Sequence, residues 1–146
     1  MKKTVYIFIT ALCSFIFACT KQTYAPTETV RDTVDTTHSM QQLRGTFNNG
    51  PYGSVSGIVK ILNDSSNYSL LLDSFTTNNG PDLHVYLSQE VQPVHFIDFG
   101  KLKSTNGTQV YAINGAPDFN LYKYALIHCQ QYNHLFGSAA LSKQFF

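Results

Sequence analysis

The chain has 146 residues, and its 10 Lys and Arg side chains nearly balance its 9 Asp and Glu side chains, giving a formal charge of +1 at pH 7. Phosphate binding requires clustered Lys and Arg, so this chain, which has no basic stripe, is not expected to bind nucleic acid. Trp is absent, whereas 11 Phe and 9 Tyr are present. A core must therefore be built from these rings together with Leu and β-branched side chains.

The N-terminus has the features of an export signal. Lys2 and Lys3 precede an apolar run over Val5–Ala18 that is too short to cross a bilayer as a stable helix. The run ends in Ile16-Phe17-Ala18-Cys19, which resembles the bacterial lipobox. We predict a lipoprotein signal peptide over residues 1–18 and a lipid on Cys19, so that the chain meets the membrane through an anchor. The alternative is an ordinary signal peptide that is cleaved nearby.

An anchored protein of this kind is expected in the cell envelope of a Gram-negative bacterium, facing the periplasm or the cell surface. The residues after Cys19 lack an acidic cluster that resembles a surface-export signal, which favours the periplasmic side. From there to Gln42 the chain is rich in Thr, Gln, Asp and Glu, and it cannot bury enough apolar surface to offset its ordering entropy. We predict a flexible tether over residues 19–42.

Residues 43–146 have the length of one domain, and their periodicity favours strands at nearly every step. Val55, Val59 and Ile61 fall on one face of a strand, and turn-forming segments rich in Asn and Gly separate the apolar runs. The sequence predicts an all-β fold, an antiparallel β-sandwich or barrel of seven to eight short strands. The expected strands cover residues 55–62, 68–73, 83–87, 96–102, 110–113, 122–130 and 135–141, with a short helical turn at 118–122.

Cys129 is the central candidate for chemistry, because it is the only thiol left if the signal is removed and Cys19 carries a lipid. It shares a strand face with Ala125 and Ile127, so it is either an inert core residue or a reactive or ligating group. An imidazole nearby would activate it. His134 lies past a turn and could fold back toward the thiol, which makes it the better candidate partner, whereas His128 points to the opposite strand face.

A cofactor is not specified by the sequence. Cys129 and His134, with His84 or His95 upstream, superficially resemble a blue-copper ligand set, but the axial Met is missing from the expected domain. Haem could be held by an axial Cys or His, although no CxxCH attachment sequence is present. Structural zinc sites take several Cys or His ligands in close pairs, and this chain lacks them. No metal site is therefore predicted, and the cofactor is unknown, with haem, copper or none as the alternatives.

Asp82, His84 and Tyr86 alternate with apolar residues, which is typical of the solvent side of a half-buried sheet. The functional alternative is a small ligand pocket formed by Asp82, His84 and Tyr111. We find no Ser-His-Asp ordering, no paired catalytic carboxylates and no glycine-rich phosphate loop. An enzyme with turnover of its own is therefore not expected.

Ordered blocks along the domain resemble the DM13 (DM-thirteen) family, and the most specific are Gly80-Pro81-Asp82-Leu83-His84-Val85-Tyr86-Leu87 and the segment from Cys129 to Phe136-Gly137. The resemblance implies an extracytoplasmic domain, often joined to haem- or sugar-binding DOMON domains, that takes part in electron transfer. It also implies that Cys129 acts as a bare thiol or as a ligand of a prosthetic group. The family usually has Trp where this chain has His128, and an aliphatic residue where it has His134.

Two functions from different classes follow from these observations. The first is an envelope-anchored module that takes part in electron transfer or thiol redox chemistry with a protein partner through Cys129. The second is a non-catalytic domain that binds a glycan or another envelope protein, in which Cys129 is only packed. The reactivity of the thiol in the native protein distinguishes the two.

Overall fold

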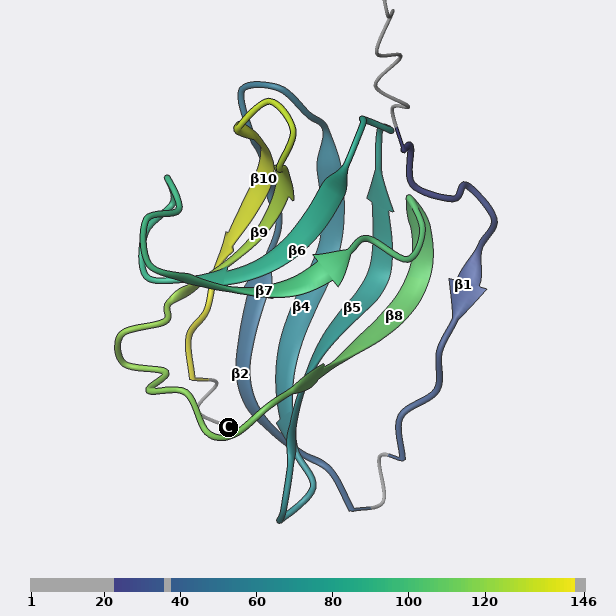
Figure 1. The fold of residues 1–146 in the computed structure, drawn as a ribbon. Helices are drawn as coiled ribbons and strands as arrows, with labels where there is room; N and C mark the ends of the chain where they lie inside the picture. Colours follow the sequence, from purple (N-terminus) through teal and green to yellow (C-terminus); the bar gives the residue numbers. More distant parts are fainter. Residues whose placement is uncertain (1–22, 36–37, 144–146) are drawn as a thin grey trace, which may run out of the picture.

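The computed structural model describes residues 23–35 and 38–143, and within them the chain forms ten strands and no helix (Figure 1). A helix long and apolar enough to cross a membrane is accordingly absent from these residues. The predicted signal peptide and Cys19 lie outside the described residues. The strands are β1 (Val30–Arg31), β2 (Met40–Thr46), β3 (Asn48–Asn49), β4 (Val55–Asn63), β5 (Tyr68–Thr77), β6 (Leu83–Ser88), β7 (Phe96–Lys101), β8 (Asn106–Ile113), β9 (Tyr124–Cys129) and β10 (His134–Ala140).

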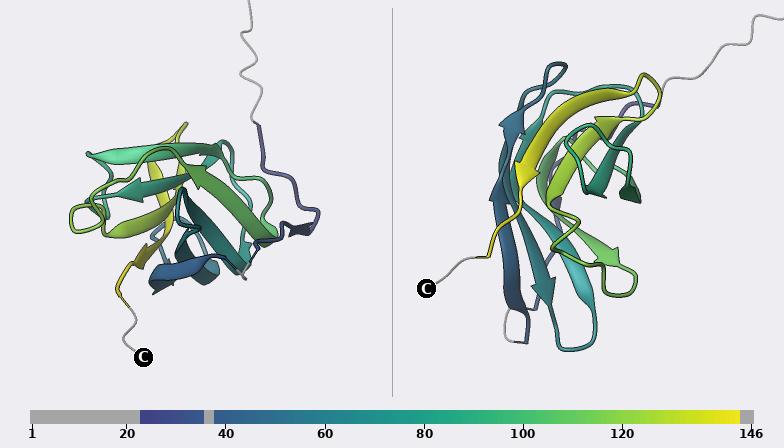
Figure 2. Two further views of the ribbon diagram at one scale, coloured as in Figure 1. Left: turned by 90° about the horizontal axis from the view of Figure 1, so that it is seen from below. Right: turned by 90° about the vertical axis from the view of Figure 1, so that its left-hand side faces the viewer.

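The strands form two five-stranded sheets, which lie against each other as a sandwich (Figure 2). The first sheet has the order β1-β8-β5-β4-β2, and the second has the order β3-β10-β9-β6-β7. The predicted all-β sandwich is thus confirmed, and each of the seven strands expected from the sequence has a counterpart. All pairs are antiparallel except one, because β1 pairs with β8 in parallel. The predicted helical turn at 118–122 is a single hydrogen-bonded turn, in which the Tyr122 amide donates to the Asp118 carbonyl.

The core lies between the sheets and draws on alternate residues of the central strands. Val59 of β4 and Leu72 of β5 belong to the same buried cluster as Val85 of β6 and Ile127 of β9. Side chains on successive residues of a strand point to opposite faces, so Cys129 shares the inward face of β9 with Ile127. The sequence-based prediction for this face is confirmed.

The segment predicted as a flexible tether is partly ordered against the domain. β1 pairs with Gly107 and Thr108 of β8 along the edge of the first sheet (Figure 1). The side chain of Ser104 donates to the carbonyls of Pro26 and Glu28, and β2 already begins at Met40. These contacts use backbone groups and small polar side chains. They could therefore not be inferred from the low apolar content on which the prediction of a tether was based.

One carboxylate, that of Asp32, holds the N-terminal segment 23–35 against the domain. Asp32 Oδ2 accepts hydrogen bonds from Lys103 Nζ at 2.6 Å and from the Val110 amide at 2.9 Å. The hydrogen bond from Lys103, followed by that from the Val110 amide, holds the pKa of Asp32 below its ordinary value of 3.8. A carboxylate whose pKa is lowered by folding stabilises the native state above the unfolded pKa, and this stabilisation is lost as the pH falls through the folded pKa.

Replacing Asp32 by Asn should therefore cost about 1 kcal/mol at neutral pH, because a charge-assisted bond is lost from a partly exposed site. The cost should shrink as the pH is lowered below about 3.8. Chemical denaturation of both proteins between pH 7 and pH 3 measures the difference. A cost that is the same at both ends of this range would show that the Asp32 charge does not hold the segment.

Candidate functional site

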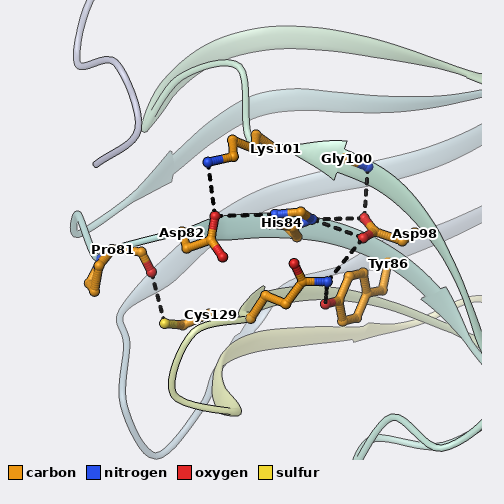
Figure 3. Close-up of polar contacts among 9 residues, drawn as sticks. Pro81, Asp82, His84, Tyr86, Asp98, Gly100, Lys101 and Cys129 are labelled. Atoms are coloured by element: carbon orange, nitrogen blue, oxygen red, sulfur yellow. Dashed lines mark hydrogen bonds and ion pairs between the residues drawn. The ribbon is translucent and has the colours of Figure 1, made fainter. Parts of the chain in front are cut away.

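Cys129 is the last residue of β9, at the point where the chain leaves the core for the exposed turn 130–133. It is the one free cysteine among the described residues, and it is only 1% exposed. Its thiol donates a hydrogen bond of 2.8 Å to the carbonyl oxygen of Pro81 (Figure 3). The sulfur thus lies at the rim of the core, beneath one segment of backbone.

This segment, Gly80–Asp82, forms a cover over the thiol, and three contacts hold it in place. Tyr24 and Pro81 form an isolated antiparallel bridge, and the Asp82 amide donates to the Thr23 carbonyl at 2.8 Å. The Asp82 carbonyl accepts from the Gln130 amide, directly after the cysteine. Asp82 also has a positive φ of 56°, a left-handed conformation that non-glycine residues adopt at some cost. The N-terminal segment therefore helps to keep the thiol covered.

The predicted imidazole partner is a backbone neighbour of the cysteine. His134 lies directly opposite Cys129 in the β9–β10 pair. Its ring, however, stacks on Tyr52 with centroids 3.6 Å apart and an interplanar angle of 1°. The thiol hydrogen bond that the structure describes goes to the Pro81 carbonyl and not to this ring.

The predicted pocket of Asp82, His84 and Tyr111 is brought together only in part. His84 Nε2 lies 3.4 Å from Asp82 Oδ1. Tyr111 belongs to β8 of the other sheet, where its hydroxyl donates to Gln109 Oε1 at 2.9 Å and accepts from the Lys103 amide at 3.0 Å. Burial raises the pKa of Tyr111, so this phenol stays protonated. It lines an open hollow of about 450 Å³ together with Asp98.

The expectation that His84 and Tyr86 face solvent is wrong. They are only 7% and 2% exposed, although they lie on the outer face of the second sheet. Tyr86 stacks on Phe96 at a centroid distance of 4.3 Å and forms a second apolar cluster with Leu126 and Leu135. Burial is accordingly the main cause of the raised pKa of Tyr86. Alternation of polar and apolar residues located the two faces of β6, but it could not reveal that neighbouring aromatic and apolar side chains cover the outer one.

Polar groups missed by the sequence analysis complete this face. Both carboxylate oxygens of Asp98 lie within 3.0 Å of His84 Nδ1, and one also accepts from the Gly100 amide. Lys101 Nζ lies 3.0 Å from Asp82 Oδ1. The hydrogen bond from Lys101 is the main cause of the lowered pKa of Asp82. The positive φ of Gly100 marks an irregular point in β7, but the contact of Asp98 with His84 spans 14 residues and has no local signal in the sequence.

His128 lies beside this network on β9. Its ring stacks on Tyr86 at 5.2 Å. Burial, followed by the nearby imidazoles of His134 and His84, lowers the pKa of His128. The Asn133 side chain opposes this shift, but it does not reach hydrogen-bond geometry with the ring.

Fold and site together define an all-β two-sheet domain that carries a covered thiol at its rim and a buried imidazole cluster on one outer face. The family model described as electron transfer DM13 matches residues 46–141. The chain therefore belongs to the DM13 electron-transfer family, as the sequence blocks indicated. Searches among curated proteins and among solved structures found no match.

Proposed function

We propose that this protein is an envelope-anchored electron-transfer module in which Cys129 exchanges thiol and disulfide with a protein partner. The family supports a role in electron transfer. The choice of Cys129 rests on its position in the fold. It is the last residue of β9, beside an exposed turn, and the segment that covers it is held largely by hydrogen bonds rather than by a second layer of core. A local movement of Gly80–Asp82 would uncover it without unfolding either sheet.

The proposed reaction needs a partner that carries a disulfide. The Cys129 thiol loses its proton to solvent, and the thiolate attacks one sulfur of that disulfide. A new S–S bond joins the two proteins, while the other partner sulfur leaves as a thiolate and takes up a proton. A protein dithiol, the reductant in this scheme, then attacks the Cys129 sulfur, so that the partner leaves as a second thiolate and takes up a proton. The other thiol of the reductant loses its proton and closes a disulfide within the reductant, which releases Cys129 as a thiolate. Two electrons thus pass from the dithiol through Cys129 to the partner disulfide. In the closed conformation the cover prevents such an attack, because exchange needs direct access to sulfur.

A packed, unreactive cysteine in an interaction domain is the second candidate. It is favoured by the 1% exposure of Cys129 and by its membership of the main buried cluster with Ala125 and Ile127. The two candidates differ in how the thiol becomes exposed. A redox thiol is reached by local opening of its cover, whereas a packed thiol is reached only when the whole domain unfolds.

Alkylation kinetics across a range of sub-denaturing urea concentrations separate the two. We expect Cys129 to react with iodoacetamide through an opening whose free energy is well below the global free energy of unfolding and nearly independent of urea. Small openings expose little surface and therefore have a small denaturant dependence. A labelling free energy that equals the global value and has its full urea dependence would contradict the redox role.

A thiol placed elsewhere on the same strand face provides the control. In a Cys129→Ser background, Ala125→Cys puts a thiol on the inward face of β9, at a position that is fully buried and away from the Pro81 cover. This control thiol is expected to react only through global unfolding. If the control thiol labels as readily as Cys129, the opening that exposes Cys129 is not a local movement of the Gly80–Asp82 cover.

The anchor is part of the same proposal. The lipobox-like Ile16-Phe17-Ala18-Cys19 supports lipidation of Cys19, which would place the domain at a membrane surface. The tether is then short, because residues 23–35 run along the domain and supply part of the cover. Mass spectrometry of the N-terminal peptide from the native host should show acyl chains on Cys19, and globomycin should block its maturation. An unacylated N-terminus would end the anchoring proposal and leave the thiol chemistry untouched.

A further inference from the structure

Two buried histidines lie on neighbouring strands on the outer side of the second sheet. His84 of β6 and His128 of β9 are direct partners in the antiparallel register. Both rings pack near Tyr86, with centroid distances of 6.1 Å and 5.2 Å. Directly opposed residues of antiparallel strands have Cβ atoms about 4.5–5.5 Å apart, so their side chains can reach a common point.

Three nitrogens of this pair have no hydrogen-bond partner within the described structure. They are His84 Nε2 and both ring nitrogens of His128. Both residues are more than nine-tenths buried, with exposures of 7% for His84 and 3% for His128. Buried polar atoms are almost always paired, so three unpaired nitrogens on two directly opposed residues indicate a group that binds there.

The tautomer of His84 shows what kind of group fits. A carboxylate only accepts hydrogen bonds, so His84 Nδ1, which faces Asp98 at 2.9 Å and 3.0 Å, carries a hydrogen. The other nitrogen, Nε2, lies 3.4 Å from Asp82 Oδ1, an oxygen that Lys101 Nζ also contacts at 3.0 Å. Nε2 is therefore the nitrogen of this ring that is left to bind a further group. A carboxylate on the far nitrogen is also the usual support of a metal-ligating histidine.

We propose that His84 and His128 are the protein ligands of a late first-row transition-metal ion, of the zinc and copper class that imidazole prefers. The carboxylates of Asp82 and Asp98, offset in part by Lys101, make the surroundings favourable for a cation. No three His, Cys, Asp or Glu side chains within residues 23–35 and 38–143 are arranged to enclose an ion. The remaining coordination positions therefore belong to water or to an exogenous ligand. This site is separate from the Cys129 thiol, which lies on the inward face of β9.

Urea unfolding of the purified full-length chain in Zn²⁺ or in EDTA tests this assignment. Thiols and histidines that bind zinc in the unfolded state can only reduce the stabilisation, so a stabilising shift reports a site that folding creates. At free zinc about 100 times the dissociation constant, the unfolding equilibrium constant should fall about 100-fold, equivalent to about 2.7 kcal/mol. Mg²⁺ should cause no shift, since it prefers oxygen ligands.

His128→Phe removes two orphan nitrogens and keeps a ring against Tyr86, so it should fold and lose the zinc response. His128→Leu is the second variant, because Leu126 and Leu135 already line that face. His95→Ala, at an exposed histidine, and Cys129→Ser should keep the full response. The Cys129→Ser result keeps the metal site and the thiol chemistry distinguishable. A native chain with no zinc shift would overturn the proposal, and so would an unchanged shift in both His128 variants.

Discussion

Replacing Gly107 by Ala should destabilise the domain by about 3 kcal/mol, one of the largest effects expected of a single substitution in this chain. Gly107 has a φ of +111°, a conformation that L side chains rarely adopt. A Cβ at this position would also overlap the carbonyl oxygen of Val30, which is its partner in the parallel β1–β8 pair. The strain alone costs about 1–2 kcal/mol, and loss of the β1 hydrogen bonds adds about 1 kcal/mol for each bond.

Gly115→Ala is the matched control for this prediction. Gly115 also has a positive φ, +78°, but a Cβ there meets nothing within 4 Å. It should therefore lose only about 1 kcal/mol, from strain. Thermal unfolding of both variants measures the difference, and Gly107→Ala is expected to melt at least roughly 8 °C lower than the control. Equal losses would mean that the close approach of β1 to β8 contributes nothing to stability.

The sequence predicted the part of the fold that is built from side-chain burial. The strands β4 to β10 alternate apolar residues with polar ones and are separated by turn residues, so their positions could be predicted from this local pattern alone. β1 and β3 could not be predicted in this way, because they are two-residue edge strands of polar or mixed composition, Val30–Arg31 and Asn48–Asn49. Backbone pairing holds them, and backbone pairing has no pattern in the sequence.

The candidate site could likewise be predicted only where it depends on the local alternation of residues along a strand. Alternation along β9 correctly put Cys129 on the core face and His128 on the opposite face. The hydrogen bond from the thiol to Pro81 spans 48 residues, and the direct pairing of His84 with His128 depends on the β6–β9 register. Neither could be read from local periodicity, because β6 and β9 are neighbours in the sheet but are separated in sequence by β7 and β8.

Phe136 connects the stability of the domain to the proposed chemistry, because its ring fills the space beside two glycines. A Cβ added at Gly80 would overlap its Cζ, and one added at Gly53 would lie 2.6 Å from its Cδ1. Gly80 begins the cover over Cys129, so the ring supports that cover from below. Phe136 is 6% exposed, and its replacement by Ala should cost about 3–5 kcal/mol because a cavity remains.

Phe136→Ala should also lower the free energy of the local opening that exposes Cys129, so that iodoacetamide labels the native protein at least roughly 10-fold faster, equivalent to about 1.4 kcal/mol. Phe47→Ala is the control: Phe47 is 5% exposed and packs edge-on against Phe75, away from the cover. It should cost a similar global free energy and leave labelling at low urea unchanged. Labelling that follows global stability equally in both variants would mean that the thiol is reached only by unfolding, and Cys129 would then be a packed core residue.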